Sequence, residues 1–294
     1  MISILIPTRD YDCHLLVEEL HRQGKALGTP FEILVAEDGT DTAQLHLNAG
    51  IENLAYCRRI VKKENIGRAR IRNLLATEAR YANLIFIDSD AIVEKDNFLK
   101  RYTNALEESD VVCGGLYHAN CQPNEHCSLR YRYEKKADSL RDAATRSKAP
   151  YDKFTTFNFA IKKTIFTSIL FDTAITGYGY EDALFGKELE KRNIRITHID
   201  NPLLHCGLEK NEIFLAKTEQ ALRNLATIKE SIGNTPLIAV AKKLKRYHIV
   251  WLFMLYWRFR RKSLRKNLLG SNPSLEKFNI YKLGYYITAC KNIS

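Results

Sequence analysis

Three short apolar runs, each followed by charged residues, limit what this chain can fold into more than any other feature. The runs cover residues 2–6, 31–36 and 84–87. Short runs that are almost entirely apolar are typical of strands buried on both faces of a parallel sheet. Segments with helical spacing lie between them. This alternation predicts an α/β fold: a Rossmann-like, mostly parallel sheet with helices on both faces.

The remaining elements follow the same reasoning. Further strands are expected at 56–61 and from residue 110, and helices at 12–27, 67–81, 96–107 and 212–231. The polar segment 125–150 is expected to be a helix or a flexible lid, and 154–208 a composite region.

Charged residues follow each of the three apolar runs: Arg9-Asp10, Glu37-Asp38 and Asp88-Ser89-Asp90. The carboxyl ends of parallel strands gather at one edge of a sheet, and ligands bind there. We therefore expect these side chains to line a common site.

Asp88 and Asp90 directly follow the third run. Because side chains at i and i+2 of an extended chain point to the same face, the two carboxylates should converge. Mg²⁺ and Mn²⁺ bind such oxygen ligands and keep other positions for water and substrate phosphates. The pair predicts a cation site; the alternative is a polar strand end at which Asp90 caps the next turn.

Asp38 could accept a hydrogen bond from a base N–H such as N3 of uracil, although Asp38-Gly39 is also a turn signal. Arg68, Arg70 and Arg72 lie at an expected helix start after Gly67. Helix amino termini and arginines both favour phosphate. Alternate residues do not share a helix face, so at most one or two of these arginines should reach a ligand.

Asp182 lies at another expected helix start, after two glycines that would allow an acceptor to approach closely. It is a candidate general base for an acceptor hydroxyl. The alternative is a charge that only complements the helix dipole, which would lower its pKa. His205 follows a strand-like stretch at 194–199; a lone histidine is usually structural, and a metal role is the alternative.

These segments together resemble the family 2 glycosyltransferases of the GT-A fold. The resemblance covers about residues 1–210 and rests on six motifs in the family's order: Ile4-Leu-Ile-Pro7-Thr-Arg9, Ala36-Glu37-Asp38-Gly39-Thr40-Asp41, Asn65-Ile-Gly67 with Arg72-Asn73, Phe86-Ile-Asp88-Ser-Asp90, Gly179-Tyr-Glu181-Asp182 and His205. The chain has Leu74 and Arg80-Tyr-Ala where the family often has glycine, which affects helix packing rather than the site.

The resemblance implies a GT-A catalytic domain at 1–210, with a nucleotide-binding half at 1–115 and an acceptor-binding half at 116–210. Residues 211–294 would form a helical, basic carboxyl-terminal region. The implied roles are donor binding by Pro7, Thr8, Arg9, Asp38, Gly67, Arg72, Asp88 and Ser89, metal binding by Asp90, His205 and Asp88, catalysis by Asp182, and acceptor binding by Gly179, Tyr180 and Glu181.

The implied activity is metal-dependent, inverting transfer of a sugar from a nucleotide-sugar donor to a hydroxyl of a glycan or lipid-linked acceptor, in bacterial surface polysaccharide biosynthesis. The resemblance favours UDP as the donor nucleotide, with GDP and dTDP as alternatives, and Mn²⁺ or Mg²⁺ as the cation. The sequence lacks the Gln-x-x-Arg-Trp motif and long transmembrane span of processive synthases. A single addition is therefore expected.

Two other functions fit the sequence less well. A nucleotidyltransferase would want a glycine-rich phosphate loop after the first strand, and Pro7-Thr-Arg-Asp-Tyr11 is not one. A non-catalytic protein binding nucleic acid through its basic tail would leave the acidic strand ends unexplained, because they repel phosphate. No nucleic-acid partner is expected.

The positive charge of the chain is concentrated at its end. Residues 241–294 contain 13 Lys/Arg and one acid, Glu276, whereas the first 240 residues are near neutral. The apolar run 249–257 lies between basic clusters and is too short to cross a bilayer, which takes about 20 residues. It is expected to lie as a helix on anionic lipid, or alternatively to pack on the catalytic domain.

Seven cysteines at irregular spacing, with no signal peptide before the run 2–6, favour reduced thiols and a cytoplasmic protein. With the basic tail, this favours a peripheral location on the inner face of the membrane. The segment from His118 through Cys121 to Cys127 is expected to be a polar loop, with a zinc site as the alternative.

Overall fold

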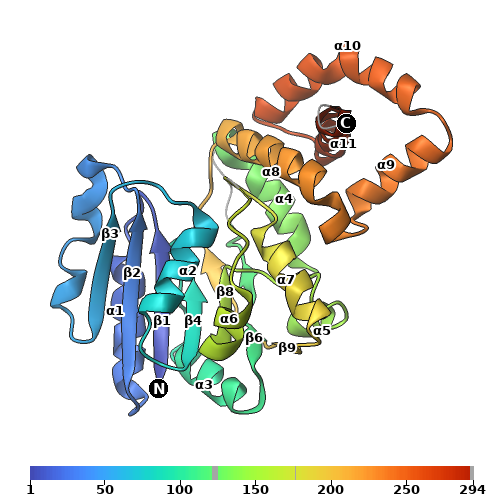
Figure 1. Cartoon of the computed structure of the whole chain (residues 1–294). Coiled ribbons are helices and arrows are strands. Elements are labelled where there is room, and N and C mark those ends of the chain that lie inside the picture. The colour runs from blue at the N-terminus through green and yellow to red at the C-terminus, as the bar shows by residue number, and fades with distance from the viewer. Residues whose placement is uncertain (121–124, 176, 292–294) are drawn as a thin grey trace. The chain divides into compact units, whose positions relative to one another are not determined.

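The computed structural model describes residues 1–120, 125–175 and 177–291 (Figure 1). The chain divides into two compact units. The first contains residues 1–119, 138–174 and 181–207, and the second contains 120–137, 175–180 and 208–294. The domain limits expected at residues 115 and 210 stay predictions.

A seven-stranded sheet forms the centre of the first unit, in the order β3-β2-β1-β4-β8-β6-β9. The pairs β1–β2, β1–β4, β2–β3 and β6–β9 are parallel, whereas β8 is antiparallel to β4 and β6. The mostly parallel sheet is therefore confirmed. The strands are β1 (Ile2–Thr8), β2 (Phe31–Asp38), β3 (Cys57–Lys62), β4 (Asn83–Ile87), β6 (Val111–Cys113), β8 (Asn158–Lys162) and β9 (Ile196–His198).

Helices cover both faces of this sheet. On one side Ile4 and Ile6 pack with residues of α1 (His14–Ala26) and α3 (Phe98–Glu108). On the other side Leu5 belongs to a core with α2 (Arg68–Glu78), α6 (Lys163–Ile169) and α7 (Glu181–Lys191). Alternate residues of β1 enter different cores, so the strand carries apolar side chains on both faces.

A smaller sheet of the first unit was not expected from the sequence. It has the order β5-β10-β7, formed by Ala91–Ile92, Leu203–His205 and Leu116–Tyr117. Strand β10 is antiparallel to β5 and parallel to β7. This sheet brings together residues just after Asp90, the end of β10 and the residues just before His118.

Short helices connect these strands. The structure has 3₁₀ helices η1 (Thr42–Asn48), η2 (Ile51–Asn53) and η3 (Glu125–Cys127) and a short helix α5 (Ala143–Ser147). Together with α4 (Ser128–Asp138), α5 accounts for much of the segment 125–150. Of the two alternatives for that segment, the structure has helices.

The second unit is helical. Its core joins Leu129 of α4, residues of α8, and residues of α10 and α11, with Trp257 against Tyr281 at 5.2 Å between ring centroids. A Cβ at Gly284 would overlap the Trp257 ring, so glycine is required there. The helices are α8 (Asn211–Ile232), α9 (Pro236–Arg246), α10 (Val250–Leu269) and α11 (Leu275–Lys291). Within the described residues, none of the helices is both long and apolar enough to span a bilayer.

Candidate active site

The carboxyl ends of β1, β2 and β4 lie side by side, because these three strands are adjacent and parallel. Pro7 and Thr8 close β1, Asp38 closes β2, and Asp88 follows β4. The shared edge predicted from the charged strand ends is confirmed.

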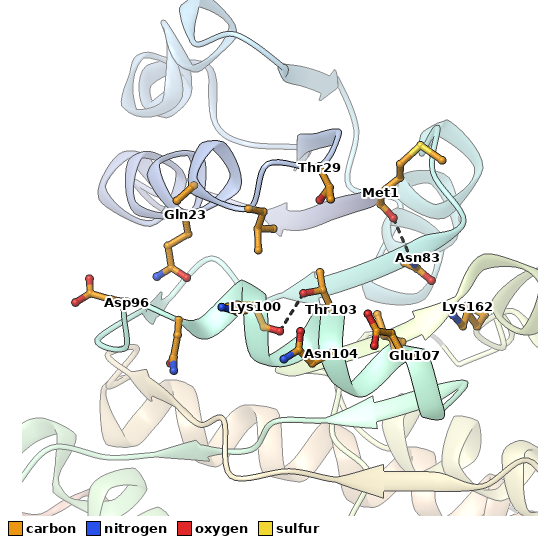
Figure 2. Close-up of a pocket in the computed structure, with 14 residues that line it drawn as sticks. Met1, Gln23, Thr29, Asn83, Asp96, Lys100, Thr103, Asn104, Glu107 and Lys162 are labelled. Atoms are coloured by element: carbon orange, nitrogen blue, oxygen red, sulfur yellow. Dashed lines mark hydrogen bonds between the residues drawn. The ribbon is translucent and has the colours of Figure 1, made fainter.

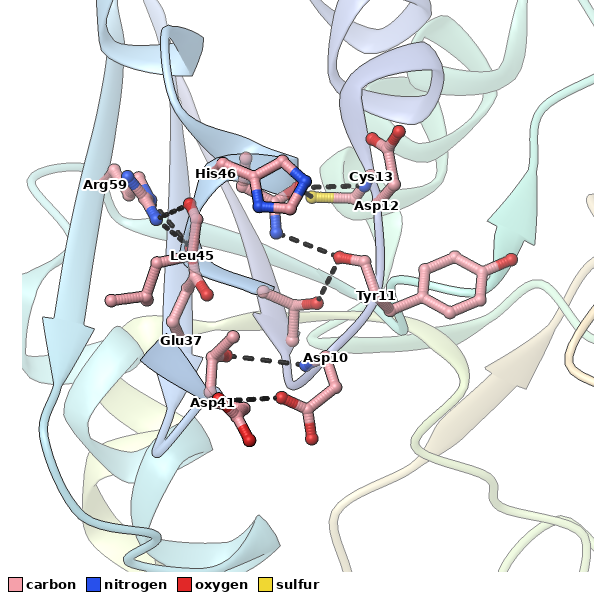
Figure 3. A network of polar contacts seen from close by, with 12 residues as sticks. Asp10, Tyr11, Asp12, Cys13, Glu37, Asp41, Leu45, His46 and Arg59 are labelled. Atoms are coloured by element: carbon pink, nitrogen blue, oxygen red, sulfur yellow. Dashed lines mark hydrogen bonds and ion pairs between the residues drawn. The ribbon is translucent and has the colours of Figure 1, made fainter. Parts of the chain in front are cut away.

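The loops after β1 and β2 are tied to each other (Figure 3). The Asp10 carboxylate accepts a hydrogen bond from Asp41 N at 2.8 Å, and Asp10 N donates to Thr40 Oγ1 at 3.4 Å. Arg9 is largely exposed, and its Nε lies 3.5 Å from Asp10 Oδ2. These contacts hold the two loops together at the sheet edge, and the Arg9 guanidinium stays accessible there.

Glu37 holds the loop after β2 in place from the protein interior. Its side chain is fully buried and accepts a hydrogen bond from Arg59 Nε at 2.7 Å (Figure 3). Arg59 also donates to the Leu45 carbonyl at 2.6 Å, so the ion pair holds η1 against the end of β2. Glu37 therefore has a structural role, and Asp38 is the residue of the pair at the strand end.

Asp38 fastens the start of α2 to the sheet edge. Its Oδ1 accepts from Ile66 N at 2.6 Å and its Oδ2 from Gly67 N at 3.0 Å. Gly39 has φ +66°, and a Cβ there would overlap Asn65 N. Because each carboxylate oxygen can accept two hydrogen bonds, this tether still leaves acceptor capacity for a base. The base-reading role stays a prediction.

Two arginines of α2 hold Asp88. Arg72, which is 2% exposed, pairs with Asp88 Oδ1, and Arg68 Nη2 lies 3.3 Å from Asp88 Oδ2. These arginines are one helical turn apart and share a face, whereas Arg70 is exposed. The expectation that the three would not share a face is confirmed.

Arg68 also reaches α7. Its Nε lies 2.8 Å from Glu181 Oε1, so one guanidinium bridges the end of β4 and the first residue of α7. The buried Nε of Arg72 has no hydrogen-bond partner among the described residues. An unsatisfied buried donor is costly unless a further oxygen binds there. This is a chemical reason to expect a ligand oxygen next to Arg72.

Asp182 has a raised pKa. Burial, and then repulsion by the Glu181 carboxylate, raise the pKa of Asp182 to about 6, although its side chain is only half-buried. A hydrogen bond from Ala183 N at 2.8 Å and the charges of Arg68 and Arg72 act in the opposite direction. The lowering expected from the helix start is thus outweighed, and Asp182 can act as a base near neutral pH.

Asp90 and His205 meet, although they are 115 residues apart in the sequence. Asp90 Oδ2 lies 2.9 Å from His205 Nε2. Cys206 N donates to the Asp90 carbonyl at 2.9 Å, and a Cβ at Gly207 would overlap Asp90 Oδ2. The end of β10 is therefore pressed against Asp90, which brings the two predicted metal ligands together.

The donor set at Asp90 and His205 suits Mn²⁺ or Mg²⁺. Adjacent ligands of an octahedral cation are about 3 Å apart when the bonds are about 2.1 Å, close to the separation seen here. Across residues 1–120, 125–175 and 177–291, no group of three or more His, Cys, Asp or Glu side chains is arranged to hold a metal ion. Asp90 and His205 thus offer two ligands, and Asp88 contacts arginines.

His118 contacts His205, whereas the sequence had suggested His118 only as part of the zinc alternative. Its Nε2 is 3.0 Å from His205 Nδ1, and its Nδ1 is 2.9 Å from Asp138 Oδ1. The pairing of β7 with β10 brings the two histidines together, and no local pattern signals that pairing. Cys121, a candidate ligand in the zinc alternative, lies outside the described residues.

The remaining predicted residues are positioned as follows. Ser89 is half-buried between Asp88 and Asp90. Gly179 and Tyr180 belong to the second unit, with φ values of +102° and +73°. A Cβ at Gly179 would lie 2.6 Å from Ala221 Cβ, so helix packing alone accounts for this glycine. The acceptor-binding role of Gly179, Tyr180 and Glu181 stays a prediction.

A separate cavity of about 480 Å³ lies at the opposite edge of the main sheet (Figure 2). Its lining includes Met1 and Asn83 at the starts of β1 and β4, with Lys100 and Glu107 of α3. Asn83 Nδ2 donates to the Met1 carbonyl at 3.1 Å. None of the predicted site residues lines this cavity.

Residues 3–169 match the model of Glycosyl transferase family 2. Among curated proteins none matches the chain.

Solved structures share the fold at low sequence identity. The mannosyltransferase PcManGT from Pyrobaculum calidifontis, in complex with GDP-Man and Mn²⁺, is 14% identical with a TM-score of 0.56, over 99% of this chain and 86% of that chain. TarS 1–349 from S. aureus, in complex with UDP-GlcNAc, is 19% identical with a TM-score of 0.52, over 98% and 81%.

A third example is glucosyl-3-phosphoglycerate synthase from Mycobacterium tuberculosis, in complex with Mn²⁺, UDP-Glc and phosphoglyceric acid. It is 14% identical with a TM-score of 0.52, over 80% of each chain. These likenesses confirm the expected GT-A fold.

Proposed function

The chain belongs to glycosyl transferase family 2 and is a glycosyltransferase, and we propose that it transfers a sugar from a UDP-sugar to a hydroxyl with inversion at the anomeric carbon. The acceptor is a glycan or a lipid-linked glycan of bacterial surface polysaccharide synthesis. The observation that carries the proposal is the convergence of Asp90 with His205 at the edge that also holds Asp88.

Asp90 and His205 would hold the divalent cation, which supplies positive charge to the leaving diphosphate. Arg72 and Arg68 add fixed positive charge beside Asp88, and the unpaired Nε of Arg72 offers a donor to a phosphate or ribose oxygen. The proposed donor site comprises Pro7, Thr8, Arg9, Asp38, Gly67, Arg72, Asp88 and Ser89.

UDP is the nucleotide that we favour. TarS and the mycobacterial synthase were solved with UDP-sugars, and PcManGT with GDP-Man. Asp38 closes β2 at the site edge, and a carboxylate there can accept the N3–H of uracil. The cation in two of these three structures is Mn²⁺.

Asp182 is the proposed base. It takes the proton of the acceptor hydroxyl as the oxygen attacks the anomeric carbon from the face opposite the diphosphate, which inverts that centre. A pKa of about 6 leaves the carboxylate ionised at neutral pH and more basic than an exposed aspartate. Gly179, Tyr180 and Glu181 are proposed to border the acceptor.

A donor panel tests this function. With Mn²⁺ or Mg²⁺ the protein is expected to release UDP from a UDP-sugar faster than GDP or dTDP from their sugars, and EDTA should abolish release. Free UDP should appear rather than pyrophosphate, which separates sugar transfer from nucleotidyl transfer. The anomeric coupling constant of the product, read by NMR, reports inversion. Full turnover in EDTA would contradict the proposal.

A second part of the proposal is peripheral attachment to the cytoplasmic face of the membrane, by helix α10. Five apolar side chains of α10 are exposed at the spacing i, i+1, i+4, i+5 and i+8, which places them on one face: Trp251, Leu252, Leu255, Tyr256 and Phe259. The opposite face, with Trp257, Leu264 and Leu268, is buried in the second unit's core.

Cations adjoin the exposed stripe. Arg258, Lys262 and Lys266 are exposed on the same side of the helix, in a segment of 13 Lys/Arg and one acid. The aromatic side chains of Trp251 and Phe259 in this stripe are 68% and 74% accessible. An apolar stripe of this kind, bordered by cations, is complementary to an anionic lipid surface. Such attachment would suit a lipid-linked acceptor.

Vesicle sedimentation tests this attachment. The full-length protein should bind vesicles containing phosphatidylserine at low salt, and should be released at about 0.5 M salt, where charges are screened. Trp251→Ser with Phe259→Ser should weaken binding about tenfold or more, since each buried aromatic contributes about 1.5–3 kcal/mol. Leu15→Ser is the control, because Leu15 is 83% exposed on α1. No binding to these vesicles, or self-association through α10 instead, would contradict the proposal.

A further inference from the structure

We propose that Asp138 and Arg141 control which ring nitrogen of His205 carries the proton, and that Asp138 selects the form in which His205 can bind a metal cation. Asp138 and Arg141 are then positioning residues that act through His118. The inference rests on the proposed metal site at Asp90 and His205.

Four side chains of the first unit form a continuous chain of contacts away from Asp90. His205 Nε2 lies 2.9 Å from Asp90 Oδ2, and His205 Nδ1 lies 3.0 Å from His118 Nε2. His118 Nδ1 faces two groups of opposite kind, which are themselves paired at 3.0 Å: Asp138 Oδ1 at 2.9 Å and Arg141 Nη1 at 3.1 Å. A carboxylate only accepts and a guanidinium only donates, so these two groups favour different tautomers of His118.

In the first arrangement the proton of His118 is on Nδ1 and is donated to Asp138. His118 Nε2 is then an acceptor and takes a hydrogen bond from His205 Nδ1–H. This leaves His205 Nε2 with a lone pair directed at Asp90 Oδ2, which is also an acceptor. Two acceptors 2.9 Å apart repel each other unless a cation lies between them, so this is the metal-binding arrangement.

In the second arrangement Arg141 donates to His118 Nδ1. The proton of His118 is then on Nε2 and is donated to His205 Nδ1, and His205 Nε2–H donates to Asp90. This arrangement satisfies Asp90 without a metal, but it removes the lone pair that a cation needs. Each histidine carries one ring proton in each arrangement, so the two arrangements differ in tautomer only and no proton is gained or lost.

The rings are held so that the nitrogens keep their places. His118 is 3% exposed and His205 is 8% exposed. The His118 ring meets His205 edge-on at 5.1 Å, and Phe157 packs edge-on against His205 at 5.0 Å. His118 N also donates to Asp138 Oδ2 at 3.2 Å, which fixes the carboxylate against the ring. The tautomer, rather than a ring rotation, is therefore what can change.

Two variants should change metal affinity in opposite directions. Asp138→Asn replaces the acceptor with an amide that can donate to His118 Nδ1, which favours the metal-free arrangement. It should weaken Mn²⁺ binding about tenfold or more. Arg141→Met removes the competing donor and should tighten Mn²⁺ binding. The measurement is titration of the full chain with Mn²⁺ alone, following free Mn²⁺ by electron paramagnetic resonance.

His198→Ala is the matched control. His198 is equally buried in the same unit, but it contacts Arg146 at 2.8 Å and the Pro150 carbonyl at 3.0 Å rather than His205. The His198→Ala variant should bind Mn²⁺ as the wild type does. Wild-type affinity in Asp138→Asn, or an equal loss in Arg141→Met and His198→Ala, would overturn the inference. A wild-type protein that binds no Mn²⁺ would overturn the proposed metal site and this inference with it.

A change in charge alone would shift Mn²⁺ affinity in the same directions, so the tautomer has to be read directly. Long-range ¹H–¹⁵N spectra of the wild-type histidine rings, with and without Mg²⁺, distinguish Nδ1–H from Nε2–H. His205 should carry its proton on Nδ1 when Mg²⁺ is bound, and on Nε2 in Asp138→Asn. The wild-type spectra test the tautomer of His205 even if a variant fails to fold. A metal-bound His205 protonated on Nε2 would overturn the inference.

Discussion

Replacing Asp182 with Asn is expected to abolish sugar transfer, with a loss of about a thousandfold or more, while the donor still binds. An amide has no basic lone pair that can take the acceptor proton, and general base catalysis is worth about 10²–10⁴-fold. The donor contacts proposed above are made by other residues. The measurement is product formation beside UDP binding by calorimetry, with Asp110→Asn as the control, because Asp110 is exposed in the same unit. Transfer at the wild-type rate would remove Asp182 from the mechanism.

The pH dependence follows from the same carboxylate. The pKa of Asp182 is raised to about 6, so the wild-type kcat/KM should fall as the pH drops through about 6. An ordinary aspartate, with a pKa of about 3.9, would keep full activity there.

The Asp182→Asn substitution should also stabilise the folded protein, and the direction of this effect with pH follows from the raised pKa of Asp182. The folded-state pKa is above the unfolded value, so between about pH 4 and pH 6 the folded state holds a proton that the unfolded state has lost. The wild type therefore loses stability as pH rises through this window, by up to about 3 kcal/mol. Asp182→Asn should unfold at a higher temperature than wild type at pH 8, and at a similar temperature near pH 4.

Asp90→Asn is expected to lower metal-dependent transfer by about a hundredfold or more, and His205→Ala similarly. Asp90 and His205 are the two proposed ligands, which the structure brings within 2.9 Å of each other. A catalytic cation stabilises the charge of the leaving group by several kcal/mol. The Mn²⁺ concentration that gives half-maximal nucleotide release should rise in both variants. Wild-type activity in Asp90→Asn would contradict the metal site.

Gly207→Ala gives a graded version of the same test. Its backbone does not need glycine for conformational reasons, because its φ is outside the left-handed region, but a Cβ would overlap Asp90 Oδ2. The variant should move the carboxylate and require more Mn²⁺ for activity, with partial rescue at high Mn²⁺. Gly270→Ala is the control, since a Cβ there has its nearest neighbour at 3.4 Å.

Local sequence determines those features of this protein that depend only on residues close together in the chain. The run 2–6 is apolar because alternate residues of β1 enter two cores, so its pattern alone indicates a strand buried on both sides. Arg68 and Arg72 share a face while Arg70 does not, because helical periodicity decides that without any tertiary contact. Asp88 and Asp90 follow a buried strand and therefore had to lie at a sheet edge.

Only the tertiary structure decided how these residues combine. Asp90 meets His205 across 115 residues because β10 pairs with β5, a contact between strands of two and three residues that carries no local signal. The same small sheet brings His118 behind His205 through β7. The pKa of Asp182 depends on burial and on Glu181, and burial is a property of the folded chain.

The strand pattern and the acidic strand ends, which the sequence determined by itself, thus place a group of acidic side chains at the carboxyl edge of a parallel sheet. The folded structure decided which acid turns toward which partner: Asp88 to Arg72 and Arg68, and Asp90 to His205. The physical reason is that periodicity and apolar runs act over a few residues, whereas ion pairs, tautomers and shifted pKa values depend on groups that only folding brings within about 3 Å.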